Sequence, residues 1–317
     1  MKCDPKLAFV FPGQGSQSVG MLTAMADRYP QVRETFTEAS DVLGYDLWEL
    51  VQNGPEEELN ATVKTQPALL AASVALWRLW QGQGGSVPAL LAGHSLGEYS
   101  ALVCAGALHL PDALVLVAER GALMQSAVPA GRGSMAAILG LDINDVAAIC
   151  ARVANGQVVA VANINSPGQI VIAGHTDAVR RAVAAAREEG ARRSVVLPVS
   201  VPSHCALMRD AAAQFAARVE AVPVFVPTIP VIHNVDVTSK ADPAAIRQAL
   251  VEQLCQPVRW VETIEKMAAR EIHRFIECGP GKVLTGLARR IHGGAETFPL
   301  HDPESFHAAL AASGAEA

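Results

Sequence analysis

The chain has 317 residues, of which 50% are hydrophobic and 18% are charged, and its formal net charge is −6. This length and composition allow a large buried core, and the negative balance excludes a surface that binds nucleic acid as a whole. Six scattered cysteines without a C-x-x-C pair predict reduced thiols packed as small hydrophobes. The N-terminal apolar run is broken by Pro12-Gly13, too early for a signal peptide or membrane span. We therefore expect a soluble cytoplasmic protein with no membrane contact.

The first hundred residues alternate between predicted strands and helices. Residues 7–15, LAFVFPGQG, predict a buried strand that ends in a glycine-rich turn. Helical patterns follow and end in a strongly apolar helix over 66–81. A second buried strand over 88–95 enters a turn at Ser95, and the chain returns as a helix over 96–108. Continuous apolar strands that alternate with helices indicate a parallel sheet covered on both faces.

The pattern changes near Gly131. The order of predicted elements becomes β-α-β-β-α-β, which indicates a ferredoxin-like subdomain over residues 131–200. We therefore predict an α/β fold, in which a hydrolase-like core with a mostly parallel sheet, residues 1–130 and 201–317, carries this insertion. Strands are expected in 133–141, in two parts of 158–174 and in 193–202, and helices over 143–154 and 176–191.

After His204 the patterns of the main domain resume. Roughly the last 25 residues are small and polar, which predicts a peripheral helix or a loose tail. Before them we expect a helix over 206–222, a strand over 229–235, a helix over 258–271, and a strand, turn and helix over 273–291.

A serine stands between two glycines in Gly93-His94-Ser95-Leu96-Gly97. The pattern G-x-S-x-G between a strand and a helix is the signature of a nucleophile elbow. The glycines remove side chains that would clash where the chain reverses. They leave the serine at a helix N-terminus, where free amides favour an oxyanion. The alternative is a serine that caps the helix between packing glycines.

A serine nucleophile needs a base, normally a histidine. His204, in PVSVPSHCALM, follows a predicted strand and starts a helix, a loop position typical of catalytic groups. His94 adjoins the serine, but on so sharp a turn we expect it to point elsewhere. His109 and His175 are less suitably placed, and a cap or surface role for His204 is the alternative.

No acidic residue has an obvious position from which to orient the histidine. Asp142, Asp145 and Asp177 fall in the predicted subdomain, and Asp236 lies in a distant loop. This pattern is compatible with a dyad whose histidine is held by a backbone or amide oxygen.

Six motifs in order, from residue 7 to about 291, are similar to those of one known family. The chain resembles the bacterial malonyl-CoA:acyl-carrier-protein transacylases. The resemblance implies the fold described above and a ping-pong transfer of malonyl from malonyl-CoA to the phosphopantetheine thiol of acyl carrier protein, through a malonyl-serine, for fatty acid biosynthesis. It implies no cofactor and no metal. The motifs are FVFPGQGSQSVGM, GHSLGEYSALVCAGAL, ANINSPGQIVIAGH, VSVPSHCALM, PVRWVETI and ECGPGKVLTGL.

The resemblance also implies roles for individual residues. Ser95 matches the nucleophile and His204 its base, while Gln253, in VEQLCQPVRW, matches the residue that orients the histidine through an oxygen acceptor. The amides of Gln14 and Leu96 match the oxyanion hole. The predicted substrate-binding residues are Arg120, Gln14, Leu96, Met124 and Asn163.

Arg120, in LVAERGALMQ, matches the arginine that binds the free malonyl carboxylate. A guanidinium suits this task because it binds a carboxylate through two parallel hydrogen bonds. An ordinary surface pair with Glu119 is the alternative. Gly13-Gln14-Gly15 does not predict a dinucleotide site, because Ser18 stands where the third glycine of G-x-G-x-x-G is needed.

The predicted partners are acyl carrier protein and coenzyme A, with no nucleic acid and no membrane, and we expect a monomer. Arg192 and Arg193 match a basic pair near the carrier-docking cleft of the family, and solvated helix-end charges are the alternative. Arg289 and Arg290 are second candidates. Malonyl transferases of polyketide or malonate decarboxylase systems and a serine thioesterase or esterase remain alternative functions.

Overall fold

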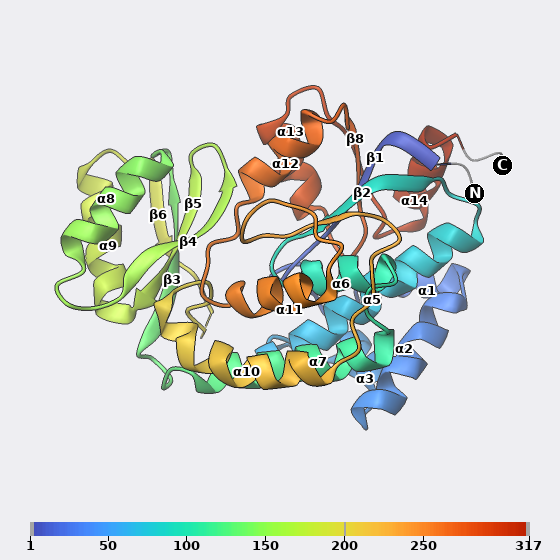
Figure 1. The fold of residues 1–317 in the computed structure, drawn as a ribbon, viewed down its shortest axis with the longest axis horizontal. Coiled ribbons are helices and arrows are strands. Elements are labelled where there is room, and N and C mark those ends of the chain that lie inside the picture. The colour runs from blue at the N-terminus through green and yellow to red at the C-terminus, as the bar shows by residue number, and fades with distance from the viewer. Residues whose placement is uncertain (1–2, 200, 315–317) are drawn as a thin grey trace.

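The computed structural model describes residues 3–199 and 201–314, whose strands form two separate sheets (Figure 1). Sheet A has the strand order β7-β2-β1-β8-β9, and its neighbouring strands are all parallel, as predicted. Its strands are β1 (Cys3–Phe11), β2 (Val87–Gly93), β7 (Val231–Ile232), β8 (Arg274–Glu277) and β9 (Glu296–Pro299).

Helices cover both faces of sheet A. On one face, a hydrophobic core lies between the sheet and the helices α12 (Trp260–Ala268) and α13 (Val283–Ile291). On the opposite face, a larger hydrophobic core joins the sheet to the other helices of this part of the molecule. These are α1 (Thr23–Arg28), α2 (Gln31–Leu43), α3 (Leu47–Asn53), α4 (Glu56–Leu59), α5 (Thr62–Gly82), α6 (Gly97–Cys104), α7 (Leu110–Ser126), α10 (Arg209–Ala221), α11 (Pro243–Glu252) and α14 (Pro303–Ala312).

Alternate residues of β1 face these two cores. Phe9 packs edge-on against Trp77 and Trp80 of α5, with ring centroids 5.1 and 5.2 Å away. Ala8 and Val10 belong to the core on the other face. Since successive side chains of a strand point to opposite faces, the continuous apolar run of β1 results from burial on both sides.

Sheet B is antiparallel with the strand order β4-β5-β3-β6, and α8 and α9 pack against it through one shared core. Figure 1 shows this unit at the left, beside the larger α/β core. The predicted ferredoxin-like arrangement is confirmed, and residue 200, the expected end of the subdomain, lies outside the described residues. The elements are β3 (Gly133–Leu139), α8 (Ile143–Val153), β4 (Val159–Ser166), β5 (Gln169–His175), α9 (Thr176–Glu188) and β6 (Arg193–Val196).

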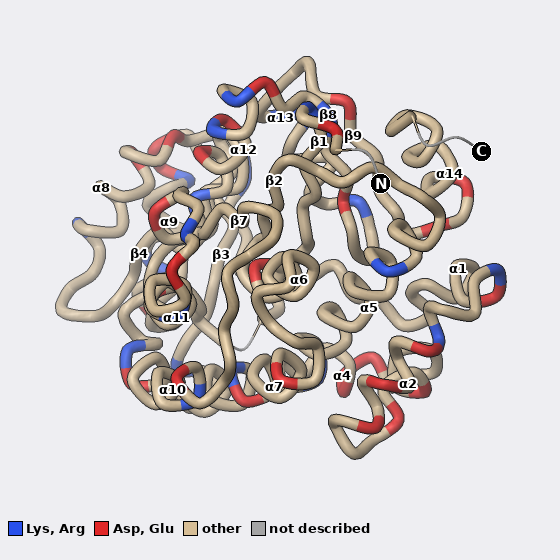
Figure 2. The backbone as a smooth tube through the Cα atoms, turned by 45° about the vertical axis from the view of Figure 1, so that its right-hand side comes forward, with Lys and Arg blue, Asp and Glu red and all other residues tan. Residues whose placement is uncertain are grey.

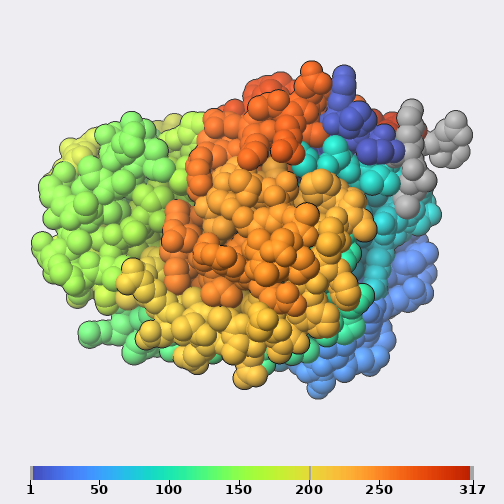
Figure 3. Space-filling model, viewed as in Figure 1, coloured from blue at the N-terminus to red at the C-terminus, as the bar shows by residue number. Residues whose placement is uncertain are grey.

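The chain then returns to the larger core. A short 3-10 helix, Ala206–Met208, precedes α10. In Figure 3 the yellow and orange residues that follow sheet B occupy the front of the molecule, between the green subdomain and the blue N-terminal helices.

The structure departs from the prediction near the C-terminus. We expected a helix or a loose tail, but β9 pairs parallel with β8 at the edge of sheet A. The sequence of this strand, ETFP, has a single large apolar residue and therefore lacks the apolar run that marks the other strands. α14 is a helix as predicted, and its Phe306 is fully buried against Tyr29 and Trp80, with ring centroids 5.7 and 6.2 Å apart.

Four further elements differ from expectation. The strand expected over 229–235 is reduced to β7, and the strand expected over 193–202 ends at Val196. The helix expected over 96–108 ends at Cys104. α11 was not predicted at all. Its sequence nevertheless carries a start signal, because the Asp242 carboxylate accepts hydrogen bonds from the amides of Ala244 and Ala245.

All six cysteines are free. Cys104, Cys150, Cys205 and Cys278 are buried as expected, whereas Cys255 is only partly buried and Cys3 is exposed, contrary to the prediction. Within the described residues, no helix has the length and apolar character needed to span a membrane.

Candidate active site

Ser95 lies on the tight turn between β2 and α6, with the left-handed backbone angle φ of 53°. A Cβ atom on Gly93 would lie 1.8 Å from the carbonyl carbon of Gly97, and one on Gly97 would lie 2.0 Å from the carbonyl oxygen of Phe11. Both glycines are therefore required by close approach of the backbone. The Ser95 hydroxyl does not cap α6, whose N-terminus has no side-chain cap, so the capping alternative fails.

A second residue supports this strained turn. The Ser95 amide donates to Oδ1 of Asn234, at 2.8 Å, and Asn234 Nδ2 donates to the carbonyl oxygen of Gly93, at 2.7 Å. Asn234 lies in the loop that follows β7 and is 1% exposed. Asn234 was not predicted, because nothing in the local sequence links it to a turn 139 residues away.

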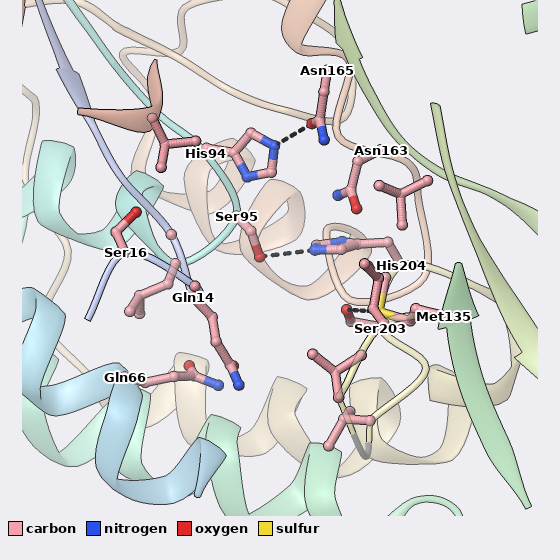
Figure 4. A pocket seen from close by; sticks show the side chains of 18 of the residues that line it. Gln14, Ser16, Gln66, His94, Ser95, Met135, Asn163, Asn165, Ser203 and His204 are labelled. Carbon is pink, nitrogen blue, oxygen red and sulfur yellow. Dashed lines mark hydrogen bonds between the residues drawn. The ribbon is translucent and has the colours of Figure 1, made fainter. Parts of the chain in front are cut away.

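Figure 4 shows the imidazole of His204 facing the hydroxyl of Ser95. The distance from Ser95 Oγ to His204 Nε2 is 2.8 Å, and the distance from His204 Nδ1 to the carbonyl oxygen of Gln253 is also 2.8 Å. Because a carbonyl oxygen only accepts, Nδ1 carries the proton and donates. Nε2 is then free to accept the serine proton.

The environment keeps this imidazole neutral. Burial is the larger cause and the positive charge of Arg120 the next, and together they lower the pKa of His204 to about 3. The ring is 3% exposed. At neutral pH His204 is therefore a neutral imidazole whose Nε2 accepts a proton, the state that a general base requires.

The side chain of Arg120, on α7, extends to the Ser95 hydroxyl and the side chain of Gln253. It is 1% exposed, its Nη2 donates to Oε1 of Gln253 at 2.9 Å, and the same nitrogen lies 3.4 Å from Ser95 Oγ. Its Nη1 donates to Oε1 of Gln66 at 2.8 Å. Burial lowers the pKa of this guanidinium, and the neighbouring Tyr99 and Glu98 oppose that shift.

The alternative for Arg120 was a surface pair with Glu119. Glu119 instead lies 3.6 Å from Nε of Arg218, on α10. The buried guanidinium and the half-exposed carboxylate point in different directions, so the surface pair is wrong.

The polar groups around Ser95 line a cavity of about 290 Å³ between sheet B and the larger core. Gln14, Leu96, Met124 and Asn163, four of the predicted substrate-binding residues, all line it, together with Arg120. Figure 4 shows Gln14 and Gln66 reaching toward each other below Ser95, and Asn163 above His204. Gln253 does not line the cavity and acts on it through its hydrogen bonds.

Two amides at this cavity are available for an oxyanion. Within residues 3–199 and 201–314, no hydrogen bond joins the amide of Gln14 or of Leu96 to a protein acceptor. A Cβ on Gly13 would lie 2.5 Å from the carbonyl oxygen of His94, so the first loop packs directly against the serine turn. This contact accounts for the glycine that precedes Gln14.

His94 was expected to point away from the reacting atoms. Its Nε2 lies 2.8 Å from Oδ1 of Asn165, and Figure 4 shows this contact, so His94 does not bond Ser95. The ring nevertheless lines the same cavity, which the sequence did not predict. Burial lowers the pKa of His94, and the ring is neutral at pH 7.

The basic residues proposed for carrier docking lie outside this cavity. Arg192 and Arg193 are exposed at the start of β6. Arg290 of α13 donates to Oε1 of Gln169, a residue of the cavity lining, at 2.8 Å. Figure 2 shows acidic positions predominating around α2 and α4, away from this region.

In the described part of the chain, no group of three or more histidine, cysteine, aspartate or glutamate side chains is placed to bind a metal ion. The arrangement around Ser95 is instead that of enzymes that pass through an acyl-serine, with a serine elbow bonded to a buried histidine. An arginine within reach of the nucleophile adds a site for an anionic acyl group.

Comparisons with known proteins agree with this class. Residues 8–296 match the family described as acyl transferase domain, and the chain belongs to this family. It is 59% identical over 305 residues to the malonyl CoA-acyl carrier protein transacylase of Salmonella typhimurium, covering 96% of this chain and 99% of the relative.

Solved structures give the same result. An acyl carrier protein S-malonyltransferase from Vibrio cholerae has a TM-score of 0.94 and 57% identity, covering 96% of this chain and 99% of the other. A malonyl-transacylase solved in complex with its type II PKS acyl-carrier protein has a TM-score of 0.96 and 54% identity, covering 97% and 99% of the two chains.

Proposed function

We propose that this protein transfers the malonyl group from malonyl-CoA to the phosphopantetheine thiol of acyl carrier protein, for fatty acid biosynthesis. The similarity along nearly the whole chain to malonyl CoA-acyl carrier protein transacylases supports this assignment. The observation that carries it is the buried guanidinium of Arg120, 3.4 Å from the Ser95 hydroxyl. A charged group is costly to bury, and an anionic acyl group would compensate for that cost.

In the first half of the reaction, the Ser95 hydroxyl attacks the thioester carbonyl of malonyl-CoA while His204 Nε2 takes the hydroxyl proton. The amides of Gln14 and Leu96 are placed to donate to the oxyanion that forms. Collapse of this intermediate breaks the carbon–sulfur bond. The coenzyme A sulfur leaves with the proton from His204, and malonyl-Ser95 remains.

In the second half, the carrier thiol enters the position that coenzyme A has left. His204 takes the thiol proton, the sulfur attacks the malonyl ester, and the proton returns to Ser95 Oγ when the ester bond breaks. Both thioesters have similar energy, so the transfer runs in either direction. The dyad needs no cofactor, and none is proposed.

Arg120 selects the acyl group in this proposal. Gln66 and Gln253 each accept one hydrogen bond from the guanidinium, which fixes its plane before substrate arrives. The malonyl carboxylate would complete the arrangement, and the acyl chain would lie beside Met124 and Asn163 in the cavity. An acetyl group would leave the buried charge unpaired.

The proposal also covers domain organisation, cellular location and partners. Residues 131–200 form a separate subdomain, and the protein is located in the cytoplasm. The protein acts as a monomer without membrane or nucleic acid, and the exposed Arg192 and Arg193 contribute to docking of the acidic carrier.

Intact-mass measurement tests the function directly. Mixing with malonyl-CoA should add one malonyl group, and acyl carrier protein should then remove it and gain the same mass. The Ser95→Ala variant should gain none. Release of free malonate as the main product would indicate a thioesterase, and an unmodified wild-type protein would contradict any acyl-serine mechanism.

A polyketide role is the second candidate, because one solved relative is a malonyl-transacylase in complex with a type II PKS acyl-carrier protein. Rates of transfer to a fatty-acid carrier and to a type II polyketide carrier, measured under identical conditions, separate the two. A clear preference for the polyketide carrier would favour the second candidate.

A further inference from the structure

The mechanism above makes no use of Glu98, a fully buried carboxylate on the first turn of α6. It lies three residues after Ser95 in a helix that is otherwise apolar or neutral. A carboxylate is rarely buried without a specific set of partners. Its partners therefore indicate why it is present.

Glu98 accepts three hydrogen bonds. Its Oε2 accepts from the amide of Asn234 and from Nε2 of Gln253, both at 2.9 Å, and its Oε1 lies 2.7 Å from Nδ1 of His233. His233 and Gln253 are 0% exposed and Asn234 is 1% exposed, so water does not compete for these contacts.

Each of two partners holds part of the proposed catalytic arrangement. Asn234 accepts the Ser95 amide through its Oδ1. Gln253 accepts His204 Nδ1 through its backbone oxygen and Arg120 Nη2 through its side-chain oxygen. Glu98 touches none of the reacting groups, but it contacts both residues that do.

The side-chain amide of Gln253 has only one useful orientation. Its oxygen must face the donors of Arg120, and its nitrogen must then face acceptors. Those acceptors are Glu98 Oε2 and the carbonyl oxygen of Ser95, at 3.0 Å. Without an acceptor at position 98, a flipped amide would turn its N–H groups against the guanidinium.

We propose that Glu98 is a positioning residue, which fixes Gln253 and Asn234 and through them the nucleophile, the base and the arginine. The inference rests on the proposed function. It assigns the role to the acceptor oxygen Oε2 at the end of a side chain of this length, rather than to the negative charge.

Two single variants separate length from charge. In Glu98→Gln the amide oxygen takes the place of Oε2, and the amide nitrogen donates to His233 Nδ1 once that ring carries its proton on Nε2. This variant therefore keeps every hydrogen bond without the charge. Glu98→Asp keeps the charge, but its side chain is one methylene too short to reach Gln253 and Asn234 together.

The measurement is the rate of acylation of Ser95 by malonyl-CoA and by acetyl-CoA, followed by intact mass on the full-length chain. Ser100→Ala is the matched control, because Ser100 is a fully buried polar residue of the same helix and has no hydrogen-bond partner in the described structure. Melting temperature and circular dichroism confirm that each variant is folded.

We expect Glu98→Gln and Ser100→Ala to acylate with malonyl within about 10-fold of the wild type. Glu98→Asp should lose about 100-fold, because a misplacement of the reacting groups by about 1 Å has an effect of that size. The malonyl-to-acetyl rate ratio should fall in Glu98→Asp, because Arg120 loses its fixed acceptor. That ratio would not change if Glu98 served stability alone.

Three results would overturn the proposal. The first is a folded Glu98→Asp protein with normal acylation rates, and the second is a Glu98→Asp protein whose rates with malonyl-CoA and acetyl-CoA fall equally. The third is a Glu98→Gln protein as impaired as Glu98→Asp. If Glu98→Asp does not fold, Glu98→Met keeps the side-chain length but removes the acceptor for Gln253 Nε2 and should lower the same ratio, and an unchanged ratio would refute the proposal. A wild-type protein that is not acylated would instead refute the proposed function.

Discussion

Ser95 and His204 stand 109 residues apart in the chain, share a hydrogen bond of 2.8 Å, and both have left-handed backbone angles, with φ of 53° and 61°. Non-glycine residues in this conformation are strained by about 1–3 kcal/mol each and persist only where the surroundings hold them. Asn234 holds the Ser95 amide, and the carbonyl oxygen of Leu254 accepts the His204 amide at 3.0 Å.

Replacing Asn234 with alanine should release the serine turn. Two hydrogen bonds at buried atoms disappear, so we expect about 2–3 kcal/mol of lost stability and a clear decrease in the rate of Ser95 acylation. Chemical unfolding and mass-based acylation measure the two effects. An Asn234→Ala protein with wild-type acylation would show that the turn does not depend on this amide.

Replacing Arg120 with lysine should separate charge from geometry. A lysine ammonium keeps the charge but cannot bond Gln66, Gln253 and a carboxylate in one plane. We expect the kcat/KM for malonyl-CoA to fall at least about 100-fold, since losing a paired contact to a buried charge costs several kcal/mol. Acetyl-CoA should be affected much less. Equal losses on the two substrates would remove Arg120 from the selection of the acyl group.

The pH dependence of stability should carry the signature of His204. Its pKa is 6.5 in the unfolded reference and about 3 in the folded protein, so only the unfolded chain binds this proton between those values. The contribution of the neutral ring is fully present above pH 6.5 and is lost as the pH falls toward 3. A His204→Gln variant should show a flatter decline of unfolding free energy over that window, measured by denaturant titration against the wild type. A parallel decline in both proteins would contradict the assignment.

Glu271 offers a test of backbone strain away from the cavity. It is exposed, with φ of 63°, in the turn between α12 and β8. Glycine adopts this conformation without penalty, so Glu271→Gly should raise the free energy of unfolding by about 1 kcal/mol. Acylation rates should stay at the wild-type level. A lower stability would show that the side chain contributes more than the strain removes.

The sequence predicted those parts of the site that are encoded locally. The serine turn carries its own signal, because glycines are required on both sides of Ser95. His204 was recognisable from its loop position, whereas the roles of Arg120 and Gln253 came only from the family resemblance. The parallel sheet and the subdomain followed from apolar runs and element order.

Other parts could not be predicted because they depend on contacts between distant segments. Glu98, Asn234 and Gln66 gain their roles only when folding brings α5 against α7, and α6 against the loop after β7. His233 had no distinguishing sequence context, yet it is a fully buried partner of a carboxylate. β9 was missed for a different reason, since its sequence ETFP has a single large apolar residue and no apolar run.

Gln253 contacts the base with its main chain and the arginine with its side chain. Every amino acid supplies the first oxygen, whereas only a few supply the second. A mutation at this position therefore keeps the main-chain acceptor of His204 while it removes the side-chain acceptor of Arg120. Selectivity for the acyl group can in this way change during evolution while the serine–histidine dyad is retained.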